Sequence, residues 1–146
     1  MIKKIIEKIK SFNEADKILL GSILANNIVA RNKKKLSEYE FKVFSQWGED
    51  GIIQYLVQAL DIPNKNFIEF GVETYRESNT RFLLMHDNWS GLVIDGSVSN
   101  IKDIKNQSFF WRYSLNAVKS FITKENINKL LSIFSEENMN KTRQEL

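Results

Sequence analysis

The 146-residue sequence contains no cysteine, one histidine, one proline and only six glycines. Without cysteine, the chain has no disulfide, no thiolate nucleophile and no cysteine metal site. The single histidine, His86, has no second imidazole to share a metal with and no serine or cysteine nucleophile arrangement to serve. Hydrolase triads and imidazole metal centres therefore have no support, and we predict no metal site.

Long apolar runs are missing as well. No stretch is long and apolar enough to span a bilayer, and the first residues lack the apolar region and cleavage site of a secretory signal. Hydrophobic residues make up 42% of the chain and charged residues 27%, which is typical of a soluble globular domain. We therefore expect a cytoplasmic protein with no membrane span.

Neither sign of charge is in large excess, since 21 basic and 18 acidic residues give a formal net charge of +3. The densest basic run extends from Arg31 to Lys35. Such a run can contact anionic lipid or nucleic acid. It can equally be the solvated end of a helix, where positive charge complements the helix dipole. Because the net excess is small, we expect no nucleic-acid partner.

The first 44 residues read as a helical extension. Apolar residues at helical spacing predict an amphipathic helix over Met1 to Lys10. Asn13 and Asp16 stand at the spacing of a capping box, which predicts a second helix from about Glu14 to Lys33. Its broad apolar stripe needs a partner, either the rest of the chain or a second copy, so a homo-oligomer is one expectation.

The stretch from Asn66 to Ser97 organises the remainder, residues 45–146. A short apolar run, Phe67 to Phe70, stops at Gly71, and a second run, Gly91 to Ile94, stops at Asp95. The intervening residues 80–85 have helical spacing. Strand, helix and strand in this order predict a right-handed βαβ unit with two parallel strands. The fold class is therefore α/β.

Gly71 and Asp95 would share the carboxyl edge of this sheet, where ligands of such sheets bind. One interpretation is a nucleoside site, in which the Asp95 carboxylate accepts hydrogen bonds from ribose hydroxyls. The other is that Gly71 turns the chain and Asp95 caps the next helix.

Flanking segments complete the predicted domain. A helix over Ile52 to Leu60 follows the polar turn Ser45 to Gly51. After Asp95, the pattern predicts a helix over about residues 98–106, a third strand over Ala117 to Ile122 and a helix over Lys124 to Phe134. The result is a parallel sheet of about three strands flanked by helices.

The runs FIEFGVETYRESNTRFLL and NWSGLVIDGS resemble the S-adenosylmethionine-dependent methyltransferases of the FkbM-like group. The similarity extends from Ser45 through Asn128, and it is strongest to a bacterial branch found with surface-polysaccharide genes. The resemblance implies a partial Rossmann-like methyltransferase fold with S-adenosylmethionine as cofactor. It also implies methyl transfer to a small-molecule or glycan acceptor.

Candidate cofactor contacts follow from the resemblance. Glu69 and Gly71 match the first cofactor motif, and Asp95 matches the ribose contact. Glu49 starts a helix that can lie beside the cofactor in relatives, and Asn79 lies in the loop after the first strand. For Glu49 and Asn79, simple capping of a helix start is the alternative.

The sequence departs from the general methyltransferase pattern in two places. Glu73 and Tyr75 occupy positions where the motif has its later glycines, and a side chain there obstructs both a positive φ and close approach to a ligand. Relatives also continue into a strand that ends in aspartates and an asparagine, which this sequence lacks before Leu146. We therefore expect an incomplete enzyme, inactive alone, and assign no catalytic residue. The alternative is a non-catalytic oligomerising module from a truncated or split methyltransferase gene.

Overall fold

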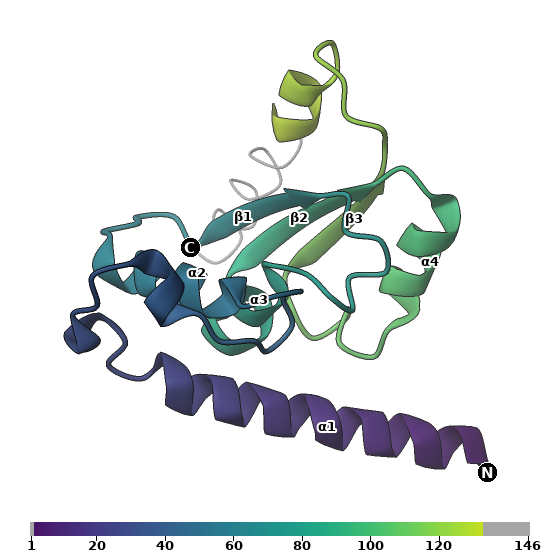
Figure 1. Ribbon diagram of the computed structural model, residues 1–146. Coiled ribbons are helices and arrows are strands. Elements are labelled where there is room, and N and C mark those ends of the chain that lie inside the picture. Colours follow the sequence, from purple (N-terminus) through teal and green to yellow (C-terminus); the bar gives the residue numbers. More distant parts are fainter. Residues whose placement is uncertain (1, 133–146) are drawn as a thin grey trace, which may run out of the picture.

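The structure is a computed structural model that describes the backbone of residues 2–132 and the side chains from residue 13 onward. Three parallel strands form one sheet in the order β1-β2-β3, with helices packed around it (Figure 1). This confirms the expected α/β class with a small parallel sheet. The elements in chain order are α1 (Ile2–Ala25), the 3-10 turns η1 (Val29–Arg31) and η2 (Leu36–Tyr39), α2 (Glu49–Ala59), β1 (Asn66–Phe70), α3 (Arg81–Asp87), β2 (Ser90–Asp95), α4 (Val98–Asn106) and β3 (Leu115–Lys119).

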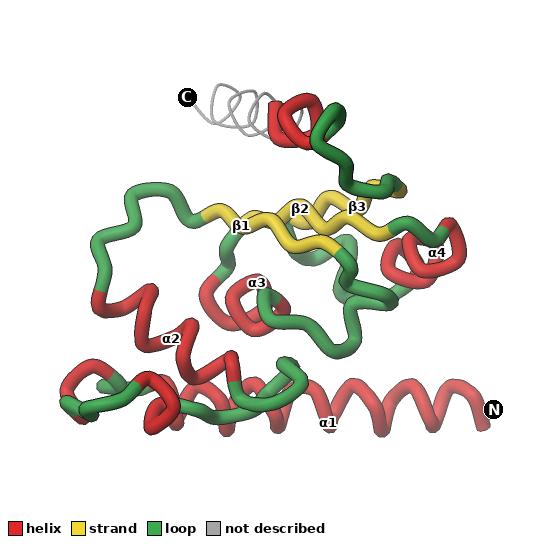
Figure 2. The backbone as a smooth tube through the Cα atoms, turned by 45° about the horizontal axis from the view of Figure 1, so that its top comes forward, coloured by secondary structure: helices red, strands yellow, loops and turns green. Residues whose placement is uncertain are grey.

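The two crossover helices, α3 and α4, lie on the same face of the sheet (Figure 2). Below them lie α2 and then α1, while a helical turn over residues 127–132 lies on the opposite face. Strand register places Phe67 beside Gly91, and Gly91 beside Leu115. Because successive strand residues point to opposite faces, Phe67 and Leu115 face the helices, and Leu92 and Ile94 face the other way.

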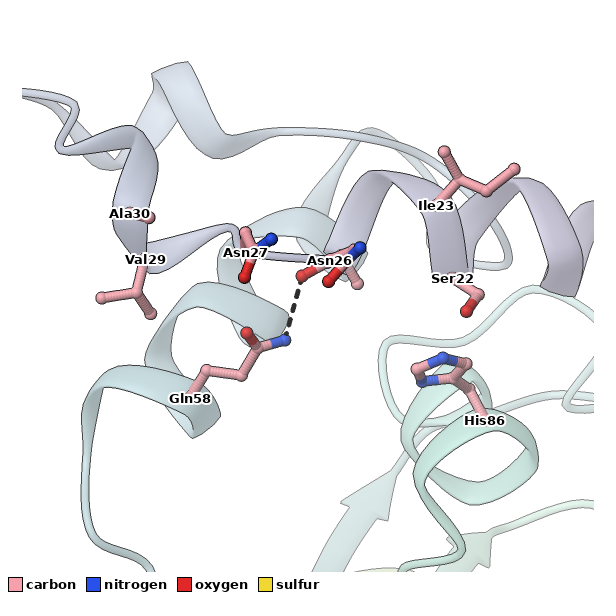
Figure 3. A pocket seen from close by; sticks show the side chains of 9 residues that line it. Ser22, Ile23, Asn26, Asn27, Val29, Ala30, Gln58 and His86 are labelled. Atoms are coloured by element: carbon pink, nitrogen blue, oxygen red, sulfur yellow. Dashed lines mark hydrogen bonds between the residues drawn. The ribbon is translucent and has the colours of Figure 1, made fainter.

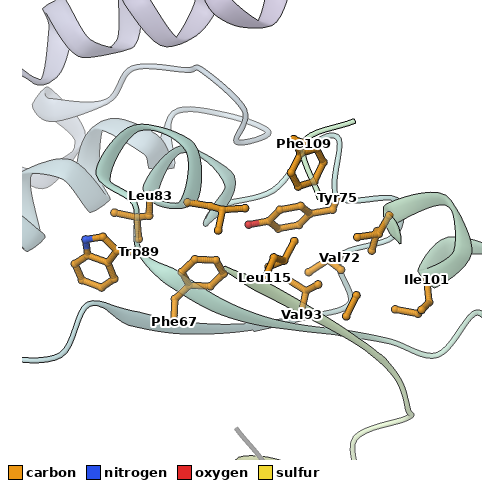
Figure 4. Close-up of a cluster of buried hydrophobic side chains, with 12 residues drawn as sticks. Phe67, Val72, Tyr75, Leu83, Trp89, Val93, Ile101, Phe109 and Leu115 are labelled. Atoms are coloured by element: carbon orange, nitrogen blue, oxygen red, sulfur yellow. The ribbon is translucent and has the colours of Figure 1, made fainter. Parts of the chain in front are cut away.

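The main core fills the space between the sheet and the two crossover helices (Figure 4). Phe67, Val93 and Leu115 rise from the strands and meet Leu83 and Leu84 of α3. Burying side chains of this size removes them from water at a gain of roughly 1.5–3 kcal/mol each. Tyr75, from the loop after β1, lies within this cluster and is fully buried.

The opposite face of the sheet is only partly covered. Leu92 and Ile94 are buried beneath Val118, Ile122 and Leu130. On β1, by contrast, Ile68 and Phe70 are 36% and 60% exposed. In the described part of the chain β1 pairs with β2 alone, so both an apolar face and a strand edge are open there.

The N-terminal helix differs from the expectation of two helices with a break at Asn13. Residues 2–25 form one continuous helix. No proline or glycine interrupts the junction at Asn13, and the ion pair of Glu14 with Arg81, at 2.8 Å, holds the residue that follows it. The predicted extension to Lys33 is also wrong. The helix ends at Ala25, and Asn27 adopts a left-handed φ of 53° that redirects the chain to bury Ile28. No helix within residues 2–132 is long and apolar enough to cross a membrane.

The third strand begins at Leu115, two residues before its predicted start at Ala117, and ends at Lys119 instead of Ile122. The Ser120 N–H still donates to the Asp95 carbonyl at 3.0 Å, but Phe121 and Ile122 leave the strand. The third strand has five residues because each of them pairs with one residue of β2, from Gly91 to Asp95. In the last predicted helix, residues 127–132 are helical, and Ile133 and Phe134 lie outside the described residues.

A buried cation, Arg81, joins the layers. Its guanidinium lies between the rings of Phe44 and Phe109, 4.8 Å and 4.6 Å from their centroids. It donates to the Tyr75 carbonyl and to the Glu14 carboxylate, both at 2.8 Å. Burial lowers the pKa of Arg81, and Glu14 opposes that shift. Arg81 therefore contacts four separate segments of its own chain.

Replacing Arg81 with methionine should cost about 3 kcal/mol or more of unfolding free energy. The substitution keeps the length of the side chain but leaves the Glu14 carboxylate and the Tyr75 carbonyl without their donor. Denaturant unfolding measures the loss. The control is Arg76→Met, which removes an exposed ion pair with Asp103 at 3.2 Å and should cost no more than about 1 kcal/mol. Equal losses of unfolding free energy in the two variants would show that the buried contacts of Arg81 stabilise the fold no more than an exposed ion pair does.

The open apolar surfaces predict self-association. Leu19, Leu20 and Ile23 on α1 are 63%, 58% and 63% exposed, and contiguous apolar surface of this kind usually marks an interface. Light scattering across a concentration series should show a mass above that of one chain. The double variant Leu20→Glu/Ile23→Glu should reduce it, whereas Leu60→Glu, at a comparably exposed leucine, should not. A single-chain mass at every concentration contradicts the prediction.

Candidate functional site at the carboxyl edge of the sheet

The carboxyl ends of the three strands surround an open hollow of about 620 Å³, called here the carboxyl-edge hollow. Its walls combine apolar side chains with a few polar groups. The lining residues are Phe70, Gly71, Ile94, Asp95, Gly96, Ser97, Ser120, Phe121 and Ile122. Ligands of open parallel sheets bind outside the carboxyl ends of the strands. The hollow therefore lies where the strand order predicts a site.

Gly71 turns the chain at the end of β1. Its φ is +70°, in the left-handed region, and its N–H donates to the Ile94 carbonyl at 2.9 Å. No atom lies within 4 Å of the point where a Cβ would stand. A side chain at this position would therefore be strained by the backbone conformation, while the space itself stays available to a ligand.

Asp95 ends β2 and holds the two neighbouring loops with its carboxylate. One oxygen, Oδ2, accepts the Glu73 N–H at 2.9 Å. The other, Oδ1, accepts the Ser97 N–H at 2.9 Å and the Asn100 side-chain amide at 3.0 Å. Oδ1 thus has both lone pairs engaged, and Oδ2 keeps one acceptor position.

The same contacts set the charge of Asp95. Burial raises its pKa, but the hydrogen bonds from Ser97, Asn100 and Glu73 outweigh burial, so the pKa lies below the ordinary value of 3.8. A carboxyl group with a depressed folded-state pKa stabilises the fold at pH values above its unfolded-state pKa. That contribution is lost as the pH falls through the folded-state pKa. Asp95 is therefore an anion at neutral pH.

Glu69 points to the helical face of β1 and binds the start of α3. Its carboxylate accepts the Ser78 hydroxyl at 2.6 Å, and the N–H groups of Asn79 and Thr80 at 3.1 Å each. The Thr80 hydroxyl donates to the same carboxylate. Thr80 is the N-cap of α3 and its side chain caps nothing. The Ser78 hydroxyl also accepts the Thr80 N–H, at 3.2 Å. An acid from the neighbouring strand and Ser78 therefore satisfy the backbone donors at the start of α3, and Asn79 supplies only an N–H group.

In the turn after β1, two residues other than glycine adopt a left-handed backbone conformation. Glu73 and Tyr75 have φ values of 49° and 59°, in the same left-handed region as Gly71. Residues other than glycine reach this region at a cost of roughly 1–2 kcal/mol. Burial of the Tyr75 ring and its hydroxyl contact with Thr80 at 3.0 Å hold the turn. The expectation that side chains at these two positions obstruct a positive φ is therefore wrong.

Glu49 lies in a different cluster, at the start of α2. Its carboxylate accepts the N–H groups of Trp47 and Gly48 at 3.1 Å and 3.0 Å. Hydrogen bonds from the backbone, Gly48 first, lower the pKa of Glu49. Next to it, Asp50 accepts three consecutive N–H groups, from Val43 to Ser45, through Oδ2. Both acids organise the loop that precedes α2.

A second hollow, of about 800 Å³, lies between the end of α1 and helices α2 and α3 (Figure 3). Gln58 lies on one side, where it donates to the Ala25 carbonyl at 3.2 Å. His86 lies on the other side, stacked on Phe82 and paired with Asp87 at 2.9 Å. This hollow borders α1 rather than the strand ends, and no residue assigned from the sequence as a cofactor contact lines it.

The structure brings some of the predicted residues together and separates others. Gly71 and Asp95 both line the carboxyl-edge hollow. Glu69 and Asn79 contact each other but do not line it, and Glu49 lies at the start of α2, in a separate cluster. Sequence reasoning missed Phe121 and Ile122 as lining residues because it placed them in the third strand. No group of histidine, aspartate and glutamate side chains among the described residues is placed to hold a metal ion.

Comparisons with protein-family models, curated proteins and solved structures found no match to this chain.

Strain at Glu73 is directly testable. Glu73→Gly should be more stable than Glu73→Ala by about 1 kcal/mol, because alanine keeps the left-handed strain that glycine relieves. At Glu77, a neighbouring exposed residue without a positive φ, the order of the two substitutions should not favour glycine. Thermal unfolding of the four variants decides. If the alanine variant is more stable than the glycine variant at both positions, the backbone at Glu73 is not strained.

Proposed function

We propose that the carboxyl-edge hollow binds the adenosyl group of S-adenosylmethionine and that the chain is the cofactor-binding part of a Rossmann-like methyltransferase. The observation that carries the proposal is the position of Gly71 and Asp95 at the ends of two adjacent parallel strands, where both line a hollow of about 620 Å³. A turn with a left-handed glycine followed by an acid on the next strand is the arrangement that nucleoside-binding sheets use.

The residues present fit an adenosyl group. Asp95 retains one acceptor position on Oδ2 for a ribose hydroxyl, and its negative charge strengthens such a bond. Phe121 and Ile122 offer an apolar wall to a purine ring. Gly71 leaves open space at the turn. When bound, S-adenosylmethionine supplies an electrophilic methyl group.

The other two acids, Glu69 and Glu49, do not line the hollow and instead bind loops of the chain. Glu69 fixes the turn before α3 with its carboxylate, and that turn contains Asn79. Glu49 fixes the loop before α2. Direct cofactor contact by Glu69 would compete with four hydrogen bonds it already accepts. We therefore give it the role of a positioning residue in this proposal, and leave ribose recognition to Asp95.

Methyl transfer to an oxygen or nitrogen nucleophile requires in-line positioning of the acceptor, with a general base where the acceptor is a hydroxyl. The acceptor we propose is a sugar or glycan precursor, which follows from the family resemblance. The contribution of the described residues is to bind and orient the methyl donor, and we assign the base to none of them.

A second candidate function is a non-catalytic oligomerising module. It is favoured by the exposed apolar side chains of α1 and by Ile68 and Phe70 on the open face of β1. Calorimetric titration with S-adenosylmethionine and with its demethylated product separates the two functions. Micromolar binding supports the methyltransferase part, and no binding of either compound supports the module.

Asp95→Asn should weaken binding of S-adenosylmethionine about 10-fold to 150-fold. The substitution preserves shape but removes the charge, and a hydrogen bond to a charged group contributes roughly 1.5–3 kcal/mol. The matched control is Asn100→Ala, which removes one of the protein contacts of Asp95 but leaves its carboxylate. Titration calorimetry on both variants, with thermal unfolding to verify the fold, is the measurement. Unchanged affinity in Asp95→Asn would assign the ribose to another residue.

A further inference from the structure

Three helices end around the hollow of about 800 Å³ that borders α1 (Figure 3). Ser22, Ile23 and Ala25 belong to the last turn of α1, Gln58 to the last turn of α2 and His86 to the last turn of α3. The last turn of a helix carries the negative end of its dipole, because the final carbonyl groups point out along the axis. Three negative helix ends therefore meet at one hollow.

Little positive charge compensates these helix ends. Lysine or arginine in a last turn stabilises a helix end of this kind, but the last turns of α1, α2 and α3 contain neither, and His86 is their one basic residue. Arg31 donates to the Leu24 carbonyl of α1, and Leu24 does not line the hollow. The Asp87 carboxylate, paired with His86, adds negative charge beside the wall. The hollow therefore favours a cation.

His86 offers a hydrogen-bond acceptor. Its Nδ1 lies 2.9 Å from Asp87 Oδ1, and Asp87 Oδ2 accepts the amide of the buried Gln54, so both carboxylate oxygens are engaged. A neutral imidazole that donates from Nδ1 keeps its lone pair on Nε2. Among residues 13–132 nothing forms a hydrogen bond with Nε2, which leaves a free acceptor on a ring that lines the hollow.

Gln58 offers a second acceptor from the opposite side of the hollow (Figure 3). Its amide nitrogen donates to the Ala25 carbonyl and to the Gln54 side-chain oxygen, at 3.2 Å each. Both N–H groups of Gln58 are thereby used, and its amide oxygen remains to accept. Ile23 and Val29 add exposed apolar side chains to the lining. A matching ligand has N–H donors, a positive charge and a hydrocarbon part.

We propose that this hollow binds an alkylammonium group, such as the end of a lysine side chain or of a free polyamine. An ammonium group has donors and no acceptor, which matches the acceptors on His86 and Gln58. Its charge is complementary to the three helix ends, and its methylene chain can contact Ile23 and Val29. None of these residues lines the carboxyl-edge hollow, so the inference is independent of the proposed function.

The single histidine makes the test direct, because the ring signals of His86 need no assignment. n-Butylammonium is titrated into the full chain labelled with 15N, at neutral pH and constant ionic strength. We expect the Nε2 signal to move and to saturate, because its lone pair accepts a hydrogen bond. n-Butanol lacks the charge and butyrate reverses it, so neither should move the signal. The protein is kept dilute, because Ile23 also belongs to the surface expected to self-associate.

Variants at Gln58 test whether the ligand occupies the hollow, and the side chain is exposed, so the core stays intact. Gln58→Lys places a tethered ammonium there and should weaken butylammonium binding about tenfold or more. Gln58→Glu adds a carboxylate and should strengthen it several-fold. The matched control is Leu60→Lys, which adds the same charge at a residue outside the lining and should change binding less than about twofold.

Saturation transfer to the butyl protons measures affinity in every variant, and thermal unfolding verifies the fold. His86→Phe keeps a ring to stack on Phe82 but removes the acceptor, so binding should weaken about tenfold. Two further ligands identify the source of the ammonium group. Nα-acetyl-lysine methylamide represents a lysine of a partner protein and spermidine a free polyamine, and the tighter ligand names the source.

Three results overturn the proposal. The first is a His86 signal that responds to none of the amines. The second is an equal response to butanol or butyrate, which would show that charge does not select the ligand. The third is an equal loss of affinity in Gln58→Lys and Leu60→Lys, which would place the bound amine outside the hollow.

Discussion

A positive charge with 1% of its surface exposed has to be neutralised and hydrogen-bonded, and Arg81 meets that requirement by drawing distant segments together. Glu14 comes from α1, Phe44 from the loop before α2, Tyr75 from the turn after β1 and Phe109 from the segment before β3. This guanidinium therefore connects the N-terminal helix to the sheet layer, in addition to the apolar contacts of Ile18 and Ala25 with Phe82. Because a buried cation tolerates few arrangements of its partners, the same contact fixes the turn that borders the carboxyl-edge hollow.

Carboxylates hold the loops in place, as Arg81 holds the layers. Glu69, Asp95, Glu49 and Asp50 each accept hydrogen bonds from backbone N–H groups of a neighbouring loop. Loops at functional edges have few backbone partners of their own, and an ionised acceptor satisfies several donors at once. The acids that looked like ligand contacts in the sequence thus have a structural role already. Only Asp95 combines that role with a place in the wall of the hollow.

The parallel sheet and its edge were predictable because they depend on short-range patterns. Apolar runs that stop at Gly71 and Asp95 predicted both strand ends correctly. The junction at Asn13 was not predictable in the same way, since a capping pattern is outweighed when the helix continues into tertiary contacts such as the Glu14–Arg81 pair. The partners of Arg81 and Glu69 depend on contacts between residues far apart in the sequence, which spacing does not encode. Phe121 was misplaced because an apolar residue after a strand looks the same whether it extends the strand or lines a hollow.

The left-handed backbone at Glu73 and Tyr75 has a consequence for how such chains are recognised. A glycine pattern indicates a backbone shape only indirectly, and in this turn one glycine and two residues with side chains all adopt a left-handed φ. A search for glycines alone would not identify such a turn, because a buried aromatic ring such as that of Tyr75 can hold the same backbone conformation. The path of a chain at a strand end can therefore be the same in two proteins whose sequences share no glycine pattern there.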